Sequence, residues 1–144
     1  MKIPSQLHEM LAREKRCFLA TCYGNKPHLS LMIFTYLADE NIVILSSRAD
    51  TTKVHNIMKN PQAALLIYSL GEEGKPSCSC TLHGTADIVN NCKEQTYRDS
   101  HRRKHPDMDN FITGEDISII AFRIEHITIA DSEDNVKNWS AETR

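Results

Sequence analysis

Six β-prone stretches separated by short turns constrain the fold of this chain more than any other feature of its sequence. Runs of β-branched, aromatic and other apolar residues, bounded by Gly, Asn, Asp or Pro, predict strands over residues 17–23, 27–37, 42–45, 63–70, 78–89 and 117–130. The run 42–45 is apolar at every position, which predicts burial on both faces. Because the strands do not alternate regularly with helices, the pattern favours an antiparallel sheet or barrel over a doubly wound parallel sheet.

Three further stretches, 4–15, 50–60 and 90–105, predict short helices. The first two carry apolar side chains at helical spacing, while the third is polar and is stopped by Pro106. Asp50 or Thr51 can cap the second helix. The expected fold is therefore mainly β, a small barrel with helices packed outside it, and 144 residues fit a single domain.

Charge and cysteine content exclude several classes of function. A net charge of -2 gives no electrostatic reason to expect a nucleic-acid partner. No apolar run is long enough to cross a bilayer, and the N-terminus has no apolar stretch typical of a secretory signal. An odd number of cysteines, five, predicts reduced thiols. We therefore expect a cytoplasmic protein that binds neither nucleic acid nor membranes.

Two residue pairs have the spacing of partial metal sites. His101 and His105 lie four residues apart on the third predicted helix, and Cys78 and Cys80 share one face of the fifth predicted strand. A structural zinc site needs further ligands nearby, and the sequence offers none. We interpret the histidines as part of a solvated, cationic helix end and the cysteines as buried thiols, so no metal site is expected.

The segment 45–53 is the part of the sequence that best fits a ligand site. An apolar strand ends in Ser46, Ser47 and Arg48, a small polar turn follows, and Lys53 lies in the first turn of the next helix. A guanidinium fork, an ammonium group, short hydroxyls and the N–H groups of a helix start are what a phosphate requires. A cation at a helix N-terminus is unfavourable unless an anion compensates it. The alternative is a capped helix whose basic side chains are simply exposed.

Several segments, taken in order, resemble the pyridoxamine 5'-phosphate oxidase-like flavoproteins. The match runs from about residue 9 to 131 and is carried by CFLATC at 17–22 with PHLSL at 27–31, SR at 47–48 with TKVHNIMKNP at 52–61, LHGTADIV at 82–89, and FRI at 122–124. The resemblance implies a six-stranded antiparallel split β-barrel that binds FMN at the interface of a homodimer. The chain 1–144 is then one FMN-binding domain, with its core at about 9–131 and a polar C-terminal tail at 132–144.

The resemblance also implies a set of cofactor contacts, which we carry over by position. They are Ser46, Ser47, Thr52 and Lys53 at the phosphate and ribityl group, Arg48 beside them, Met32, Ile33 and Phe34 along the isoalloxazine, and Ser79 at a further flavin position. Gly84, inside the fifth predicted strand, would lie near the cofactor, and a glycine there also predicts a bulge. No catalytic side chain is nominated, because the flavin itself carries the electron chemistry.

The C-terminal segment departs from the family pattern. The oxidases proper place a tryptophan and a substrate-gripping arginine after the last strand, whereas here Ala130, Asp131 and Ser132 follow it, and Trp139 and Arg144 lie in the tail. Trp139 either covers a partner's flavin or anchors the tail by packing. We expect an FMN-dependent oxidoreductase of a small molecule other than pyridoxamine phosphate, with FAD or a deazaflavin as alternative cofactors. The competing hypotheses are a non-catalytic flavin- or haem-binding carrier or sensor, and a barrel without a cofactor.

Overall fold

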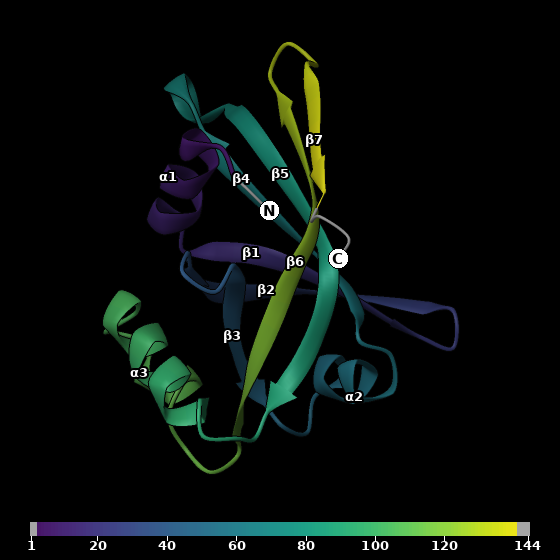
Figure 1. The fold of residues 1–144 in the computed structure, drawn as a ribbon, viewed down its shortest axis with the longest axis vertical. Coiled ribbons are helices and arrows are strands. Elements are labelled where there is room, and N and C mark those ends of the chain that lie inside the picture. The colour runs from purple at the N-terminus through teal and green to yellow at the C-terminus, as the bar shows by residue number, and fades with distance from the viewer. Residues whose placement is uncertain (1–2, 141–144) are drawn as a thin grey trace.

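An antiparallel sheet curls until two strands distant in the sequence meet. In the computed structural model, which describes residues 3–140 except for the side chains of Glu72 and Pro76, the strand order is β3-β2-β1-β4-β5-β6-β7. An additional pairing of β3 with β6 closes the first six of these strands into a barrel, which confirms the predicted fold class (Figure 1). The six strands are β1 Arg16–Tyr23, β2 Lys26–Leu37, β3 Ile42–Arg48, β4 Gln62–Leu70, β5 Pro76–Val89 and β6 Ile117–Asp131.

A seventh strand, β7 Val136–Ser140, lies in the segment that sequence analysis assigned to a polar tail. It pairs with β6 along one edge, and the Asp131 carboxylate organises the turn by accepting backbone N–H groups from Glu133 and Asn135, both at 2.9 Å. Backbone hydrogen bonds to β6 form this strand. Its polar side chains show no strand pattern, so the sequence did not predict it. Trp139 packs against the core cluster, in agreement with a packing anchor, whereas Arg144 and the other residues of 141–144, like residues 1–2, lie outside the described residues.

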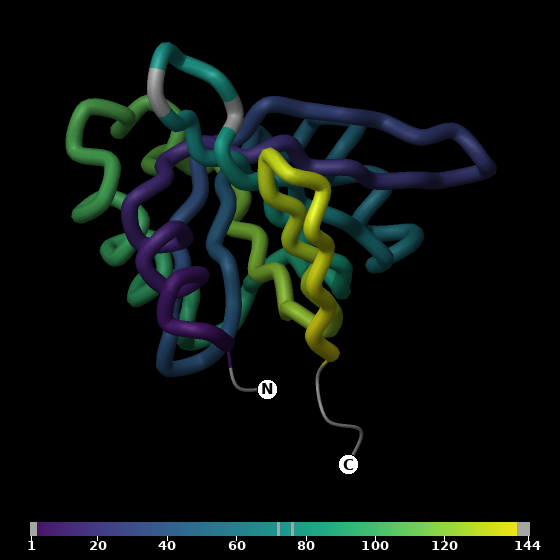
Figure 2. The backbone as a smooth tube through the Cα atoms, turned by 90° about the horizontal axis from the view of Figure 1, so that it is seen from above, coloured from purple at the N-terminus to yellow at the C-terminus, as the bar shows by residue number. Residues whose placement is uncertain are grey.

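Three α-helices lie outside the barrel, in the predicted order. They are α1 Ser5–Arg13, α2 Thr52–Lys59 and α3 Glu94–Lys104, with two short 3-10 turns at Glu72–Gly74 and Asp109–Phe111. In Figure 1, α1 and α3 lie on one side of the barrel. Figure 2 shows the β1–β2 hairpin projecting from the barrel on the opposite side. Apolar stripes dock α1 and α2, whereas α3 buries Tyr97 and His101. Within residues 3–140, no helix has the length and apolar character needed to span a membrane.

Gly84 occupies a β-bulge, as its position inside a strand predicted. The register between β5 and β6 shifts between His83 and Gly84. A Cβ atom added at Gly84 would lie 1.9 Å from the backbone oxygen of Arg123. Only a residue without a side chain therefore fits, because a strand backbone approaches this position closely. The bulge accounts for this glycine without any contact to a cofactor.

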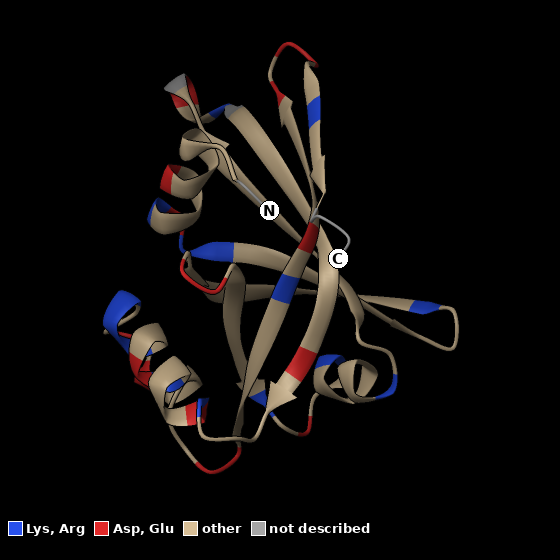
Figure 3. Cartoon of the chain, in the orientation of Figure 1, with Lys and Arg blue, Asp and Glu red and all other residues tan. Residues whose placement is uncertain are grey.

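The outer side of β1, β2 and β4 is an unusually apolar surface. We call it the outer apolar face; it consists of Phe18, Ala20, Leu29, Leu31, Ala64, Leu66 and Tyr68. Leu29 and Leu31 are 68% and 62% exposed, although most core leucines are fully buried. In Figure 3 these strands are almost free of charged residues between their ends. A contiguous apolar surface of this kind is typical of an interface.

Candidate functional site

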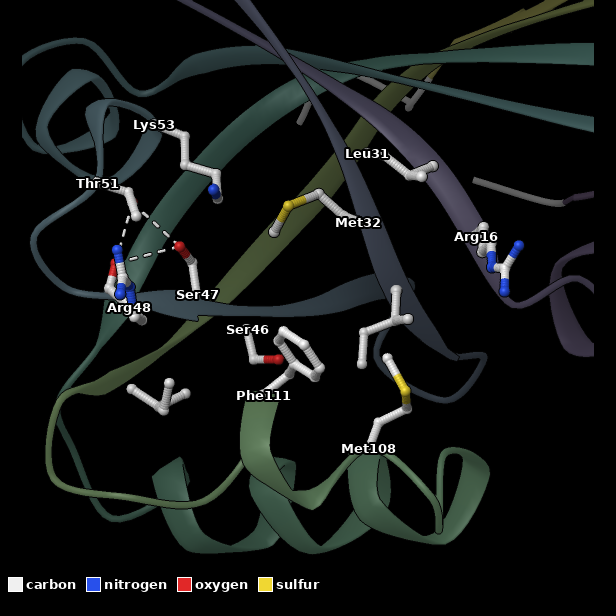
Figure 4. Close-up of a pocket in the computed structure, with 12 residues that line it drawn as sticks. Arg16, Leu31, Met32, Ser46, Ser47, Arg48, Thr51, Lys53, Met108 and Phe111 are labelled. Carbon is white, nitrogen blue, oxygen red and sulfur yellow. Dashed lines mark hydrogen bonds between the residues drawn. The ribbon is translucent and has the colours of Figure 1, made fainter.

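A cavity of about 690 Å³ opens where β2 and β3 part from each other. The two strands pair only from Phe34–Leu45 to Leu37–Ile42. Beyond that point β2 pairs with β1, and the end of β3 pairs with β6 alone. The cavity (Figure 4) is lined by Arg16, Leu31, Met32, Ile33, Ser46, Ser47, Arg48, Thr51, Lys53, Met108, Phe111 and Ile117.

Most of the predicted cofactor-binding residues meet in this cavity. Its lining includes the predicted residues Met32, Ile33, Ser46, Ser47, Arg48 and Lys53. The end of β3 and the start of α2 are joined by a three-residue turn, so Arg48 and Lys53 are held near one another by local chain geometry. The middle of β2 supplies the apolar wall beside them.

Three predicted residues lie elsewhere. Phe34 is fully buried in the core, on the same face of β2 as Met32 but at the pair with Leu45 where β2 and β3 join, so it lies beyond the opening of the cavity. Thr52 is exposed at the first position of α2 and lines a separate shallow depression, and Thr51 takes its place in the cavity lining. Ser79 lies on β5 beside Tyr68 of β4, away from this cavity. The structure therefore does not bring these three residues together with the others.

Hydroxyl groups and backbone N–H groups gather at the cationic end of the cavity. The Thr51 hydroxyl donates to the Arg48 carbonyl oxygen at 2.9 Å and lies 3.0 Å from the Ser47 hydroxyl. Thr51 occupies the N-cap position of α2, but its side chain makes no capping hydrogen bond, contrary to the predicted capping role. The first turn of α2 contains no acidic residue either. Its first N–H groups are therefore open to water or to an anion.

Lys53 lies in an electrostatically unfavourable position for a lysine. Burial, and secondarily the nearby Arg48 guanidinium, lower the pKa of the Lys53 ammonium. Arg48 itself is paired with Asp50 at 3.5 Å, in an exposed contact. Within the described residues, Lys53 has no acidic partner. A bound anion would compensate both the burial and the like charge.

The remaining walls come from parts of the chain that sequence analysis did not connect with the site. Met108 and Phe111 belong to the segment between α3 and β6, and Arg16 and Leu31 come from β1 and β2. Phe111 is 57% exposed. The available signal was an aromatic residue, with Met108 nearby, in a segment that contains no predicted strand or helix. Figure 4 places Arg16 across the cavity from Lys53, with Met32 between them.

A buried histidine supports the cavity from behind. His101 is fully buried, with its Nδ1 atom 2.6 Å from the Thr35 hydroxyl and its Nε2 atom 3.1 Å from the Ser46 hydroxyl. The polar sequence of 90–105 predicts a solvated helix end, and this prediction is wrong, because α3 has few apolar residues and docks through its polar ones. Burial, followed by the charges of His105 and Lys104, lowers the pKa of His101 to about 3.

The buried histidine makes the fold sensitive to acid. A base whose pKa drops from 6.5 to about 3 on folding binds fewer protons in the folded state, so stability is lost as the pH falls below 6.5. Between pH 7 and pH 5 this group alone should lower the free energy of unfolding by about 2 kcal/mol. Burial also lowers the pKa of His105, which adds to the loss of stability in acid. It lowers the pKa of Lys104 to about 8, and this group changes the pH dependence of stability only above neutral pH.

Urea denaturation at pH 5 and pH 7 measures this effect. His101→Gln, which cannot be protonated, should reduce the loss of stability between the two pH values. His55→Gln changes an exposed histidine on α2 and serves as the matched control. An unchanged pH profile in His101→Gln would show that the buried imidazole does not cause the acid sensitivity.

The five cysteines are all free thiols. Burial raises the pKa of Cys17 and of Cys80 to about 12, and it also raises that of Cys78. Within the described part of the chain, no three His, Cys, Asp or Glu side chains are grouped to hold a metal ion. That the pair Cys78 and Cys80 binds no metal stays a prediction, which the zinc content of the purified protein checks.

Comparison with known proteins identifies the family of this chain. The family model described as pyridoxamine 5'-phosphate oxidase matches residues 3–129. A pyridoxamine 5'-phosphate oxidase homolog of Schizosaccharomyces pombe is 29% identical, over 97% of this chain and 92% of that protein.

Solved structures share the fold at low sequence identity. A heme binding protein from Mycobacterium smegmatis has a TM-score of 0.81 and 19% identity; the match covers 97% of this chain and 60% of that one. An FAD-binding protein from Mesorhizobium loti has a TM-score of 0.71 and 16% identity, over 86% of this chain and 89% of that one. Since the family match covers nearly all of the barrel, this chain belongs to the pyridoxamine 5'-phosphate oxidase family.

Proposed function

We propose that this protein binds FMN in the cavity between β2 and β3 and uses it as an oxidoreductase acting on a small molecule. The observation that carries the proposal is that one cavity combines a cationic end, suited to a phosphate, with an apolar wall. Lys53 and Arg48 lie at one end beside the free first turn of α2, and Met32, Ile33 and Phe111 line the rest. A volume of about 690 Å³ is within the range of cofactor and ligand sites.

The lining residues hold and orient rather than react. Arginine and lysine are the only titratable residues among them, so the cavity supplies neither an imidazole nor a carboxylate as an acid or base. Bound FMN supplies hydride or electron transfer at its ring. In this arrangement Lys53 and Arg48 would hold the phosphate, Ser47 and Thr51 would hydrogen-bond to it, and the apolar side chains would exclude water from the ring.

Reconstitution tests the proposal directly. Purified protein is mixed with FMN, FAD or haem, and the bound ligand is identified by its absorption spectrum and by mass spectrometry after release. We expect stoichiometric binding of FMN, and reduction of the bound flavin by a reduced nicotinamide with turnover would support an oxidoreductase. Binding of haem but not of flavin would overturn the proposal, and so would colourless protein that ignores all three.

The site is completed by a second copy of the chain. Leu31 belongs both to the outer apolar face and to the cavity lining, so a partner packed on that face would also cover the cavity mouth. Burying exposed leucine side chains contributes about 25 cal/mol per Å² of apolar surface. Ser79 lies next to the same face and would contact flavin only across such an interface. We expect sedimentation to show a particle of twice 16.4 kDa.

A charge on the outer apolar face should both dissociate the dimer and weaken FMN binding. Leu29 is 68% exposed and lies outside the cavity lining, so Leu29→Glu acts on FMN only through the partner. Met58→Glu is the matched control, because Met58 is 71% exposed on α2, away from that face. Sedimentation and FMN titration measure both effects. A Leu29→Glu monomer that binds FMN as tightly as the wild type would show that the site is complete in one chain.

A further inference from the structure

His101 contacts the cavity residue Ser46 although it does not itself line the cavity. We propose that His101 is a positioning residue for the cofactor site: its imidazole orients the Ser46 hydroxyl so that the O–H is presented to the bound cofactor. The inference rests on the proposed FMN site and adds to it a second layer of side chains, which sequence analysis did not connect with the cofactor.

The position of His101 is set by several polar contacts of the last turn of α3. The Lys104 ammonium donates to the carbonyl oxygens of Leu11 at 3.2 Å and Glu14 at 2.6 Å, and lies 4.2 Å from the centre of the Phe34 ring. His105 Nε2 lies 2.7 Å from the Phe34 carbonyl oxygen. A carbonyl oxygen only accepts, so His105 carries its proton on Nε2. These contacts press α3 onto β2 and hold the His101 ring in place.

The two neighbours of His101 are hydroxyl groups, which allow either neutral tautomer. Thr35 and Ser46 are each 6% exposed, and the imidazole lies between them. A neutral imidazole donates from one nitrogen and accepts at the other, so one hydroxyl must donate to it and the other must accept from it. The tautomer of His101 therefore decides in which direction the Ser46 O–H points.

The charge of the cavity selects between the tautomers. With the proton on Nδ1, Ser46 donates to Nε2 and offers only lone pairs to the cavity. With the proton on Nε2, Ser46 accepts from the imidazole, and its own O–H is free to donate to a ligand. Lys53, Arg48 and Arg16 line the same cavity and favour electron-rich ligands, whose oxygen and nitrogen atoms accept hydrogen bonds. Bound FMN should therefore stabilise the Nε2–H tautomer, with Thr35 donating to Nδ1.

Two near-isosteric substitutions separate this role from simple space filling. The amide nitrogen of glutamine reaches the place of histidine Nε2 and keeps a donor toward Ser46. The shorter side-chain amide of asparagine ends at the place of Nδ1, where its oxygen can accept from Thr35, and it leaves no donor toward Ser46. His101→Asn and Ser46→Ala should each weaken FMN binding roughly 2- to 12-fold, the value of one net hydrogen bond. His101→Gln should stay within about twofold of the wild type, and the double variant His101→Asn/Ser46→Ala should match Ser46→Ala alone.

Titration of each variant with FMN, together with its melting temperature, measures these effects. If His101→Asn and His101→Gln lose FMN affinity equally, His101 has only a structural role and the inference is overturned. The same follows if the affinity losses of the two single variants multiply in the double variant. If the wild type itself fails to bind FMN, the proposed function is overturned instead. Long-range ¹H–¹⁵N spectra of the wild-type imidazole give a test that needs no variant: on FMN addition we expect the Nε2–H pattern, and an Nδ1–H pattern in the complex contradicts the proposal.

Discussion

Gly84→Ala should destabilise the barrel by about 3 kcal/mol or more, at the upper end of what overpacking costs. The added Cβ would lie 1.9 Å from the Arg123 carbonyl oxygen, 3.0 Å from its carbonyl carbon and 3.1 Å from the Phe122 ring. A flexible side chain could move aside, but a strand backbone paired along its length cannot, so the bulge between β5 and β6 must open. For a domain of this size the loss lowers the melting temperature by roughly 10 °C.

Thermal unfolding followed by circular dichroism measures this loss, with Gly24→Ala as the matched control. Gly24 lies in the β1–β2 turn at φ +60°, and a Cβ there would meet nothing within 4 Å. Gly24→Ala should lower the free energy of unfolding only by the penalty for a left-handed backbone conformation, roughly 1–2 kcal/mol. Equal melting temperatures for the two variants would show that the bulge is not sterically closed to a side chain.

Lys53→Ala should weaken FMN binding by about 10- to 150-fold and leave riboflavin binding nearly unchanged. A hydrogen bond to a charged group contributes roughly 1.5–3 kcal/mol, and riboflavin has the same ring but no phosphate. Arg48→Ala should have a smaller effect, since the Arg48 side chain is 66% exposed and already paired with Asp50. Fluorescence titration of both ligands gives the two affinities.

Lys59→Ala is the control for this experiment, because Lys59 is an exposed lysine at the other end of α2. It removes the same charge and leaves the cavity lining intact, so both affinities should stay at the wild-type values. A Lys53→Ala variant that loses FMN and riboflavin binding to the same extent would show that Lys53 is structural, and the phosphate would then have to bind elsewhere.

Much of the fold followed from local pattern. The six predicted strands are present, and the segment 42–45 extends to Arg48 because the β3–β6 pairing continues through the two serines. The cationic end of the cavity was also predictable, since Arg48 and Lys53 are joined by one short turn and need no distant segment to bring them together. Carrying Met32, Ile33 and Phe34 over by position could not show that Phe34, at the pair where β2 and β3 join, lies in the core.

What only the tertiary structure decided are the contacts between segments far apart in the chain. His101 meets Ser46 and Thr35 across 55 and 66 positions, and Gly84 is required by the backbone of Arg123 on another strand. No periodicity encodes such pairs, because each depends on where the closed barrel places an element and not on that element's own residues. The sequence by itself determined six of the seven strands and predicted a cationic turn suited to a phosphate; barrel closure determined the depth of the cavity, its far wall and the buried imidazole behind Ser46.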